Sequence, residues 1–534
     1  MSASKPLESG KVRIEPSLNK NEEKFVARRR NSVLQSLKKL QIKCSKDEVP
    51  NIALLGSGGG ERAMVGLLGS LVQLQKTSSL LDCVLYLSGV SGSTWCMASL
   101  YQEPDWSTKL EAVKDKIIQR LSGPGVSWGD SLAKLKKYYY GKDFFSMTDI
   151  WAVMVIPTYV KEINEHTLSE QWDQQGKDGK DPFPIYTVID KQSKQRNKGD
   201  PWFEITPHEA GYSLAGAFVD ASNFGSQFHK GSKKNKQDEF DMLYLQALCG
   251  SAIADEDEIK KLLWQKIKDF FQQKEKILEE MREEQDKRRE EELRRERETG
   301  SEKEAGFKLG PPEALLHHLS ERSQPDPNSP ATEECYQVLM KTVDMNLSAS
   351  TALHEPMRTT LNDLSGGRMK LVDKKEEKLN VKRHTMDVIN NLSERIHIWP
   401  FDAWMSIIKC MNRWIWGRNY NFLHNMTGEA VHSTLLESET RDFEDAGLLL
   451  NSPYLSVLRK ERNVDLIISL DFSEGDPFTT VKDAAKTCRE RNIPFPEVNI
   501  PSEDSEKPKD FYVFKGQNVP TVIHIPLFNV VNCG

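Results

Sequence analysis

The chain has 534 residues, a formal net charge of −6, a pI near 6.1 and a mean hydropathy of −0.57. This slightly acidic balance excludes the broad basic field that nucleic-acid binding needs, and the length suffices for a large core. No apolar run reaches the about 18 residues of a membrane-spanning helix. The eight cysteines form no C-x-x-C pair, which argues against a zinc site and favours a reducing compartment. We therefore expect a cytoplasmic protein without metal or cofactor, and with membrane contact only at its surface.

The first predicted elements lead into a glycine-rich loop. Residues 1–20 are expected to be disordered, and an apolar stripe predicts a charged helix over residues 21–40. A strand is predicted at 49–55, followed by Gly56-Ser-Gly-Gly-Gly60 and a helix from residue 61. Together with a second such unit further on, this pattern predicts a parallel α/β sheet with its function at the carboxyl ends of the strands.

The glycine loop is suited to hold an anion. Consecutive glycines leave backbone N–H groups unobstructed, and the following helix adds the positive end of its dipole. A Walker loop requires Gly-Lys-Ser/Thr, whereas Gly60 is followed by Glu61-Arg62, and a dinucleotide fingerprint from Gly56 would need glycine at position 61. An oxyanion hole is the better interpretation, with a purely structural turn as the alternative.

A second strand–turn–helix unit centres on Ser91. Mostly apolar residues 83–87 predict a strand, Gly89-Val-Ser-Gly-Ser93 a tight turn, and the residues from Thr94 onward a buried helix. This is the layout of a nucleophile elbow, in which a strained turn presents a serine hydroxyl to substrate. A flexible surface turn is the alternative.

The remaining chain contains further elements around a compositional break at Asp255. Helices are predicted over 105–160 and strands at 184–189 and 202–206. An apolar stripe over residues 259–281 gives way to alternating charges, which predict a solvated helix; a partner- or membrane-binding helix is the alternative.

The later part of the chain begins with a Pro/Ser/Glu-rich segment, residues 300–332, which predicts a disordered linker. Residues 401–414 predict an aromatic-rich helix, which indicates core packing or, in a lipid enzyme, an acyl cavity or an interfacial contact. Strands are predicted at 464–472 and 520–528.

A serine nucleophile needs a base to take its proton. In the Ser…Asp…His order of α/β-hydrolases a histidine comes late, and His524 is the only histidine after His432, inside an apolar strand typical of a core histidine. An aspartate can act instead where a dry site raises its pKa. Asp445, followed by Ala446-Gly447, is the candidate.

Three motifs in this order, Ser57-Gly-Gly-Gly60, Gly89-Val-Ser-Gly-Ser-Thr-Trp95 and Asp445-Ala-Gly447, resemble the patatin-like Ser/Asp acyl hydrolases. The resemblance is closest to the group IV cytosolic phospholipases A2. Within this group, the segments Trp416-Gly417 and Asn421-Phe-Leu423 of the chain are most similar to the gamma form. It covers about residues 20–250 and 415–528. Further similar segments are Phe25-Val-Ala-Arg-Arg29, Arg62-Ala-Met64, Trp202-Phe-Glu-Ile-Thr-Pro-His208, Phe224-Gly-Ser226, Val464-Asp-Leu-Ile-Ile-Ser469 and Pro494-Phe-Pro496.

The resemblance implies a function and a role for each site residue. Its implied function is calcium-independent phospholipase A2 hydrolysis of glycerophospholipid acyl esters, with lysophospholipase and transacylase activity. The implied partners are the surface of intracellular membranes and a lysophospholipid. The implied roles are Ser91 as nucleophile, Asp445 as base, Gly58 and Gly59 as oxyanion donors, and Arg62 and Arg462 as substrate-binding residues. A Ser91/Asp445/His524 esterase on small substrates and a catalytically impaired lipid-binding protein stay open as alternatives.

The implied fold is a patatin-like three-layer α/β fold with a central mixed, largely parallel sheet and a long helical or disordered insertion. The expected divisions are a disordered N-terminus (1–20), catalytic segments (21–254 and 333–534) and a charged helix with linker (255–332). No room is left before residue 20 for the calcium-binding lipid domain of some family members, so calcium is expected to be dispensable. No prenylation tail like that of the gamma form is expected, and the second catalytic segment is expected to be shortened at its C-terminus.

Overall fold

The structure is a computed structural model that describes residues 12–78, 80–174, 180–196, 199–251, 265, 401–427 and 431–527. The chain divides into two units, residues 1–253 with 415–534, and residues 254–414. The expected charged helix and linker fall outside the described residues, apart from residue 265. The first unit resumes at residue 415, later than the expected 333. In the second unit, α16 (Phe401–Arg413) occupies the helix expected at 401–414.

A mixed β-sheet forms the centre of the first unit, in the order β1-β7-β6-β5-β4-β3-β2-β12-β14-β13. The five neighbouring strands β4, β3, β2, β12 and β14 run parallel to one another. The strands on either side of these five pair antiparallel, so the parallel part is confined to the centre of the sheet. The strands are β1 (Arg13–Ile14), β2 (Ile52–Gly56), β3 (Tyr86–Gly89), β4 (Phe183–Asp190), β5 (Trp202–Ile205), β6 (Glu209–Tyr212), β7 (Ala217–Asp220), β12 (Leu466–Asp471), β13 (Tyr512–Phe514) and β14 (Thr521–Pro526).

Smaller pairings complete the β structure. β8 (Gln227–His229) and β9 (Ser232–Asn235) form a separate two-stranded sheet, while β10 (Arg418–Tyr420) pairs with β11 (Thr440–Asp445), which joins β4. β1 corrects the expectation that the whole of residues 1–20 is disordered, because Arg13 pairs with β7 and donates to both oxygens of Glu209 at 2.7 Å.

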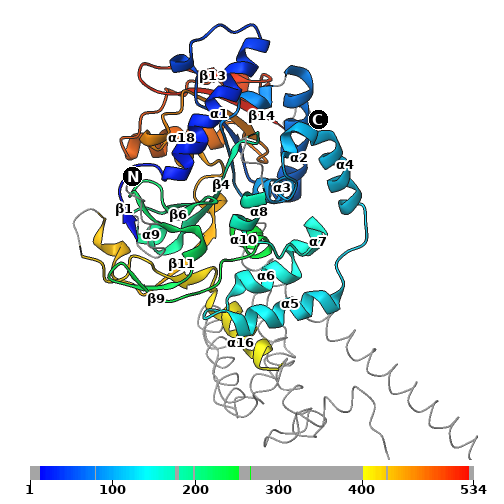
Figure 1. Cartoon of the computed structure of the whole chain (residues 1–534), viewed down its shortest axis with the longest axis vertical. Helices are drawn as coiled ribbons and strands as arrows, with labels where there is room; N and C mark the ends of the chain where they lie inside the picture. The colour runs from blue at the N-terminus through cyan, green and yellow to red at the C-terminus, as the bar shows by residue number, and fades with distance from the viewer. Residues whose placement is uncertain are drawn as a thin grey trace, which may run out of the picture. The chain divides into compact units, whose positions relative to one another are not determined.

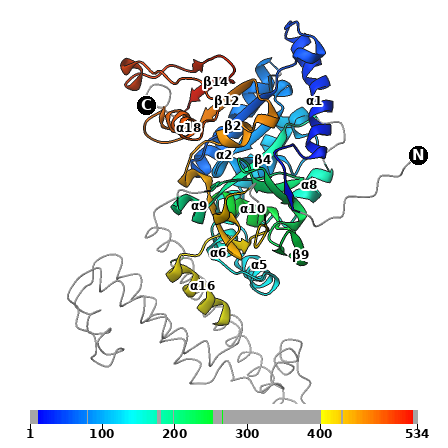
Figure 2. The ribbon, with the colours of Figure 1, turned by 90° about the vertical axis from the view of Figure 1, so that its left-hand side faces the viewer.

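Helices cover both faces of the sheet, as the resemblance predicted. α1 and α18 lie on one side and α2 and α3 on the other (Figure 1). The strands β14, β12, β2 and β4 follow one another in this order in Figure 2. The helices of this unit are α1 (Lys20–Lys39), α2 (Gly60–Ser78), α3 (Gly92–Leu100), α4 (Leu110–Leu121), α5 (Trp128–Gly141), α6 (Met147–Met154), α7 (Ile156–Val160), α8 (Leu168–Gln174), α9 (Lys191–Arg196), α10 (Met242–Cys249), α17 (Tyr454–Val457) and α18 (Thr479–Glu490). The predicted three-layer α/β fold is confirmed.

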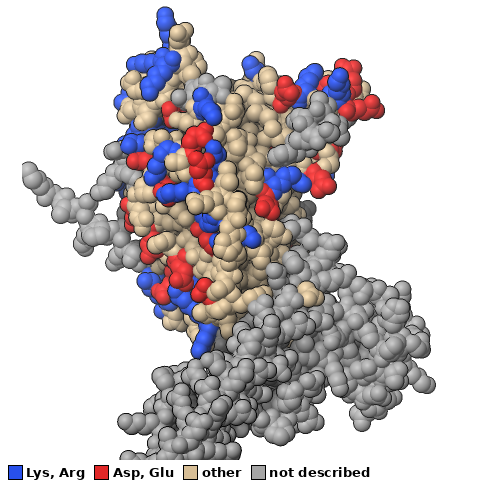
Figure 3. Space-filling view, turned by 90° about the vertical axis from the view of Figure 1, so that its right-hand side faces the viewer, with Lys and Arg blue, Asp and Glu red and all other residues tan. Residues whose placement is uncertain are grey.

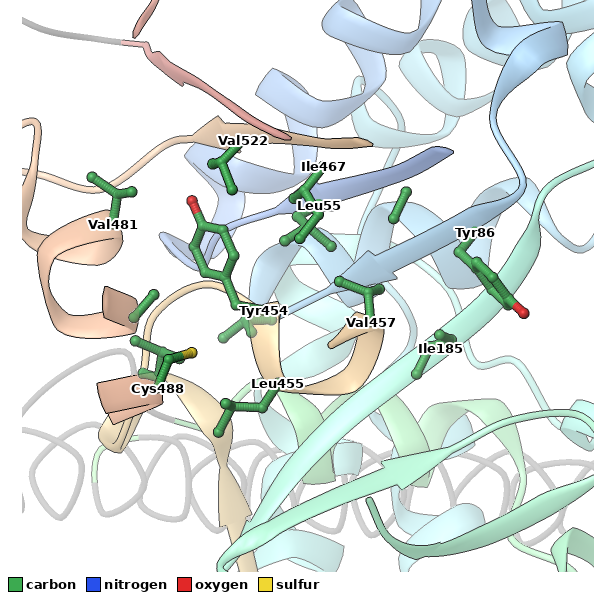
Figure 4. Close-up of a cluster of buried hydrophobic side chains, with 14 of the residues drawn as sticks. Leu55, Tyr86, Ile185, Tyr454, Leu455, Val457, Ile467, Val481, Cys488 and Val522 are labelled. Atoms are coloured by element: carbon green, nitrogen blue, oxygen red, sulfur yellow. The ribbon is translucent and has the colours of Figure 1, made fainter. Parts of the chain in front are cut away.

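The hydrophobic core explains why the parallel strands are apolar along their whole length. Leu55, Ile185, Ile467 and Val522 point to one face, where side chains of α17 and α18 cover them (Figure 4). Strands covered by helices on both faces bury every side chain, so their sequences do not alternate. The strand expected at 83–87 starts later, at Tyr86, because Leu80–Cys83 forms a 3-10 helix.

Within the described ranges, no helix is long and apolar enough to cross a membrane. On the face shown in Figure 3, Lys and Arg side chains are interspersed with Asp and Glu side chains. The charges on this face are therefore mixed in sign.

Candidate active site

Ser91 lies on a strained turn between β3 and α3. Its φ of 52° and ψ of −123° are a conformation that residues other than glycine rarely adopt, and its side chain is nearly buried. Thr187 of β4 donates a 2.7 Å hydrogen bond to the carbonyl of Gly89, which fixes the end of β3. This strand–strained serine–helix geometry is that of a nucleophile elbow.

The glycine loop lies directly against this turn. A methyl group on Gly58 would be 3.0 Å from the Ser91 Cβ, and one on Gly92 would be 1.8 Å from the Gly60 carbonyl oxygen. The Ser93 hydroxyl also donates to the Ser57 carbonyl at 2.7 Å. The first turns of α2 and α3 therefore meet beside Ser91, at a distance that only glycine permits.

The amide directions in the loop correct one expected role. Gly58 donates its N–H to the Asn451 carbonyl at 3.0 Å, so this amide is not available to an oxyanion. Gly59 has a φ of 152° and Gly60 a φ of 59°, both in the region that favours glycine. As the first residue of α2, Gly60 has an N–H without an acceptor inside its helix. The candidate oxyanion donors therefore shift to Gly59 and Gly60.

Strand pairing brings Asp445 to the same edge of the sheet. β5 occupies one side of β4 at Tyr186 and at Val188, so β3 and β11 must both lie on its other side. There, Gly89 of β3 pairs with Tyr186, and Asp445 of β11 pairs with Val188. Two positions along a strand correspond to about 7 Å. The antiparallel β11 thus ends, at Asp445, where β3 ends before Ser91.

The Asp445 side chain is completely buried, and its Oδ1 accepts a hydrogen bond from the Gly447 amide at 2.8 Å. A methyl group on Gly447 would be 3.6 Å from Val90, the residue before the serine. Burial raises the pKa of the Cys249 thiol at the end of α10, and the charge of Asp445 raises this pKa further, so the two side chains are near each other. The aspartate is therefore held between the elbow and α10.

Asn451 connects the loops of the site and was not predicted from the sequence. Its carbonyl receives the Gly58 amide, and its side-chain Nδ2 donates to the Gly58 carbonyl at 3.3 Å and to the Ser473 hydroxyl at 2.8 Å. It thereby ties the glycine loop to the segment after β12. The only sequence signal is its place six residues after Asp445.

Arg62 lies over the glycine loop with about one third of its side chain exposed. Its Nε donates to the Phe472 carbonyl at 2.9 Å, and its Nη2 would be 3.3 Å from a methyl group on Gly59. Nη1 is 3.6 Å from the Glu474 carboxylate. This guanidinium therefore lies beside the glycine loop, and its implied role in substrate binding stays a prediction.

Arg462 lies elsewhere, contrary to its implied role. Its carbonyl accepts a hydrogen bond from Asn51, the residue before β2, so it lies at the amino edge of the parallel strands. Its fully buried guanidinium bonds Glu22 and Glu204, each at 2.9 Å. The substrate-binding expectation is therefore corrected: this arginine neutralises buried carboxylates on the opposite edge from Ser91.

The structure also contradicts the Ser91/Asp445/His524 alternative. His524 is level with Ser469, Leu55 and Ser88 across β14, β12, β2 and β3. Three strand spacings amount to about 14 Å. Its Nε2 lies 2.7 Å from the Pro477 carbonyl, and burial lowers its pKa. His524 is a core histidine away from the serine.

The described part of the chain contains no group of three or more His, Cys, Asp or Glu side chains that could hold a metal ion. The site is thus built from a strained serine, a buried aspartate, a glycine loop and one arginine. On a three-layer α/β fold of the patatin-like type, this arrangement defines the class of acyl hydrolases.

Comparison with known proteins identifies the family. Residues 52–292 match the family model described as a lysophospholipase catalytic domain. The chain is 34% identical to human cytosolic phospholipase A2 gamma over 98% of its own length and 88% of the relative, and 32% identical to the mouse gamma protein over 97% and 83%. The chain belongs to the cytosolic phospholipase A2 family and is a hydrolase of the phospholipase A2 and lysophospholipase class.

A solved structure shows the same fold. Human GIVD cytosolic phospholipase A2 aligns with a TM-score of 0.62 at 22% identity, covering 98% of this chain and 59% of that chain. The same protein has been solved in complex with methyl gamma-linolenyl fluorophosphonate, with a TM-score of 0.59 to this chain at 22% identity, covering 98% of this chain and 56% of that one.

Proposed function

We propose that this chain hydrolyses acyl esters of glycerophospholipids, with Ser91 as nucleophile and Asp445 as its general base. The observation that carries the proposal is the convergence at one sheet edge of the Ser91 elbow, the glycine loop and the buried end of β11. These are the parts that acyl transfer requires: a nucleophile, a proton acceptor and amides for the oxyanion.

In the first half-reaction Asp445 takes the Ser91 proton while Oγ forms a bond to the ester carbonyl carbon. The resulting oxyanion accepts hydrogen bonds from the amides of Gly59 and Gly60, and each such donor contributes about 3 kcal/mol in comparable sites. Collapse of the intermediate breaks the bond to the glycerol oxygen, which leaves with the proton from Asp445 as a lysophospholipid. Ser91 then carries the acyl group.

In the second half-reaction water replaces the glycerol oxygen. It gives a proton to Asp445 and attacks the acyl-serine, releasing a fatty acid and restoring Ser91. A lysophospholipid hydroxyl attacks the same acyl-serine in the same way, which gives transacylase activity. Burial favours the neutral form of a carboxyl group, and Asp445 must hold a proton in each intermediate.

The substrate phosphate is placed at Arg62, whose guanidinium lies beside the glycine loop and remains partly exposed. Side chains and amides of the chain fill each of these roles, so the reaction is proposed not to need calcium. The substrates lie in membranes, and we propose that the protein works in the cytoplasm and contacts intracellular membranes peripherally.

Hydrolysis of phosphatidylcholine vesicles in excess calcium chelator tests the proposal. The unmodified chain should release fatty acid, and Ser91→Ala and Asp445→Asn should each lower kcat by at least about 1,000-fold. The exposed Ser502→Ala serves as the matched serine control and should remain active. Vesicle binding without any hydrolysis by the unmodified chain would instead support the lipid-binding alternative.

A further inference from the structure

The segment between β12 and α18 forms a third side of the site that the catalytic steps do not use. It runs from Phe472 to Phe478 and carries Glu474, whose side chain is 89% exposed. The Glu474 Oε2 lies 3.6 Å from Arg62 Nη1. A carboxylate therefore stands next to the one cation proposed to receive the substrate phosphate.

The backbone of this segment is anchored at both ends. The Phe472 amide donates a 2.7 Å hydrogen bond to the Ser57 hydroxyl, and the Phe472 carbonyl accepts a hydrogen bond from Arg62. Ser473 donates its amide to Asp471 at 3.0 Å, and the Pro477 carbonyl lies 2.7 Å from His524 Nε2. The backbone is therefore fixed on both sides of Glu474, and on the Phe472 side by bonds to the glycine loop and to Arg62.

The pair lies close to the reacting serine. Arg62 Nη2 would be 3.3 Å from a methyl group on Gly59, and a methyl group on the preceding Gly58 would be 3.0 Å from the Ser91 Cβ. A phosphate on Arg62 therefore places its head-group substituent beside Glu474. Exposed ion pairs are weak, so a substrate phosphate can replace Glu474 on Arg62 at little cost.

We infer that Glu474 selects the head group, favouring zwitterionic glycerophospholipids over anionic ones; the inference rests on the proposed function. A zwitterionic head group offers a phosphate to Arg62 and an ammonium to Glu474, so both charges of the pair are matched. An anionic head group brings no cation and leaves its negative charge beside a carboxylate.

The size of the effect follows from the exposure of the pair. An exposed charge contact contributes up to about fivefold in an equilibrium or specificity constant. The preference for phosphatidylcholine over phosphatidylglycerol should therefore fall by about two- to fivefold in Glu474→Gln. The preference should fall further in Glu474→Lys, because a lysine attracts an anionic head group. In the unmodified chain, the preference should weaken at high ionic strength.

Short-chain phosphatidylcholine and phosphatidylglycerol, used as monomers below their critical micelle concentrations, test this without the charge of a membrane surface. The ratio of the two kcat/KM values is measured for the unmodified chain, Glu474→Gln, Glu474→Lys and Glu23→Gln. Glu23 is exposed on α1 beside Glu22, which forms a hydrogen bond with Arg462 at the amino edge of the sheet. Glu23→Gln therefore makes the same change in net charge as Glu474→Gln, but far from the site.

The expected result is a ratio that falls in the order unmodified, Gln, Lys, with Glu23→Gln unchanged. Active variants with the same ratio as the unmodified chain would overturn the head-group role while leaving the proposed function intact. An unmodified chain that hydrolyses neither lipid, as monomer or vesicle, would refute the proposed function and this inference with it.

Discussion

Replacing Arg462 with methionine would take this cation away from the buried Glu22 and would leave Glu204 with Arg459 as its arginine partner. Arg462 bonds Glu22 and Glu204 at 2.9 Å each, and all three side chains are fully buried. Removing one partner of such a buried network costs about 3–5 kcal/mol, because an unpaired charge stays out of water. We expect Arg462→Met to lose stability on this scale. Because Arg462 lies at the opposite sheet edge from Ser91, the substitution tests stability and not substrate binding.

The pKa of Glu204 provides a second measure of the same interaction. Burial on its own would raise the pKa, but the nearby Arg462 and Arg459 outweigh it and lower the pKa to about 2, from an ordinary 4.5. This difference corresponds to roughly 3 kcal/mol of stability, which is present above pH 4.5 and is lost as the pH falls towards 2. Without Arg462, Arg459 is the arginine that still opposes the effect of burial, so the pKa of Glu204 rises and less stability is lost through this group as the pH falls.

Urea denaturation followed by tryptophan fluorescence at pH 7 and pH 5 measures both effects. The urea midpoint of Arg462→Met should fall at pH 7, and its difference from the unmodified chain should be smaller at pH 5, while the exposed Arg28→Met should match the unmodified chain. Adding Glu22→Gln and Glu204→Gln to Arg462→Met should recover part of the loss. An Arg462→Met protein that is as stable as the unmodified chain but inactive would refute this reasoning and return Arg462 to the substrate site.

Three further substitutions test the geometry of the site. Gly92→Ala should abolish activity, because its methyl group would lie 1.8 Å from the Gly60 carbonyl oxygen. Gly69→Ala, in open space within α2, should raise the free energy of unfolding by about 1 kcal/mol. An active Gly92→Ala together with a destabilised Gly69→Ala would contradict the packing. Asn451→Ala should lower kcat more than it raises KM, since it frees the glycine loop; unchanged steady-state kinetics would exclude this bracing role. His524→Gln should keep kcat, and, because burial lowers the pKa of His524, it should remove the part of the stability loss that begins as the pH falls below about 6.5; an inactive but folded variant would restore the triad.

Local sequence patterns sufficed for the elements that build the elbow and the glycine loop. Each unit is a strand, a run of small residues and a helix that follow one another directly in the sequence, and the structure contains both units. The position of Asp445 depends instead on pairing with Val188, which is distant in sequence. No local pattern contains that register, so the resemblance to a family was needed to single out this aspartate.

The misassigned residues show what sequence patterns leave open. In a run of glycines the direction of each amide depends on dihedral angles, and only the contact with Asn451 shows that Gly58 points away from the site. Arginine in a family motif can bind substrate or neutralise buried charge, and the sequence does not distinguish these roles. The partners Glu22 and Glu204, far from Arg462 in the chain, decide that it is structural.

The most direct test of the account is labelling with a fluorophosphonate, which reacts with an activated serine. Mass spectrometry of the labelled chain should find one adduct on Ser91, formed in proportion to the loss of phospholipid hydrolysis. Ser91→Ala should take up no label, and Asp445→Asn should take it up much more slowly, because its side chain cannot accept the serine proton. Labelling of another serine, or full hydrolysis by Ser91→Ala, would contradict the central claim that Ser91 is the nucleophile.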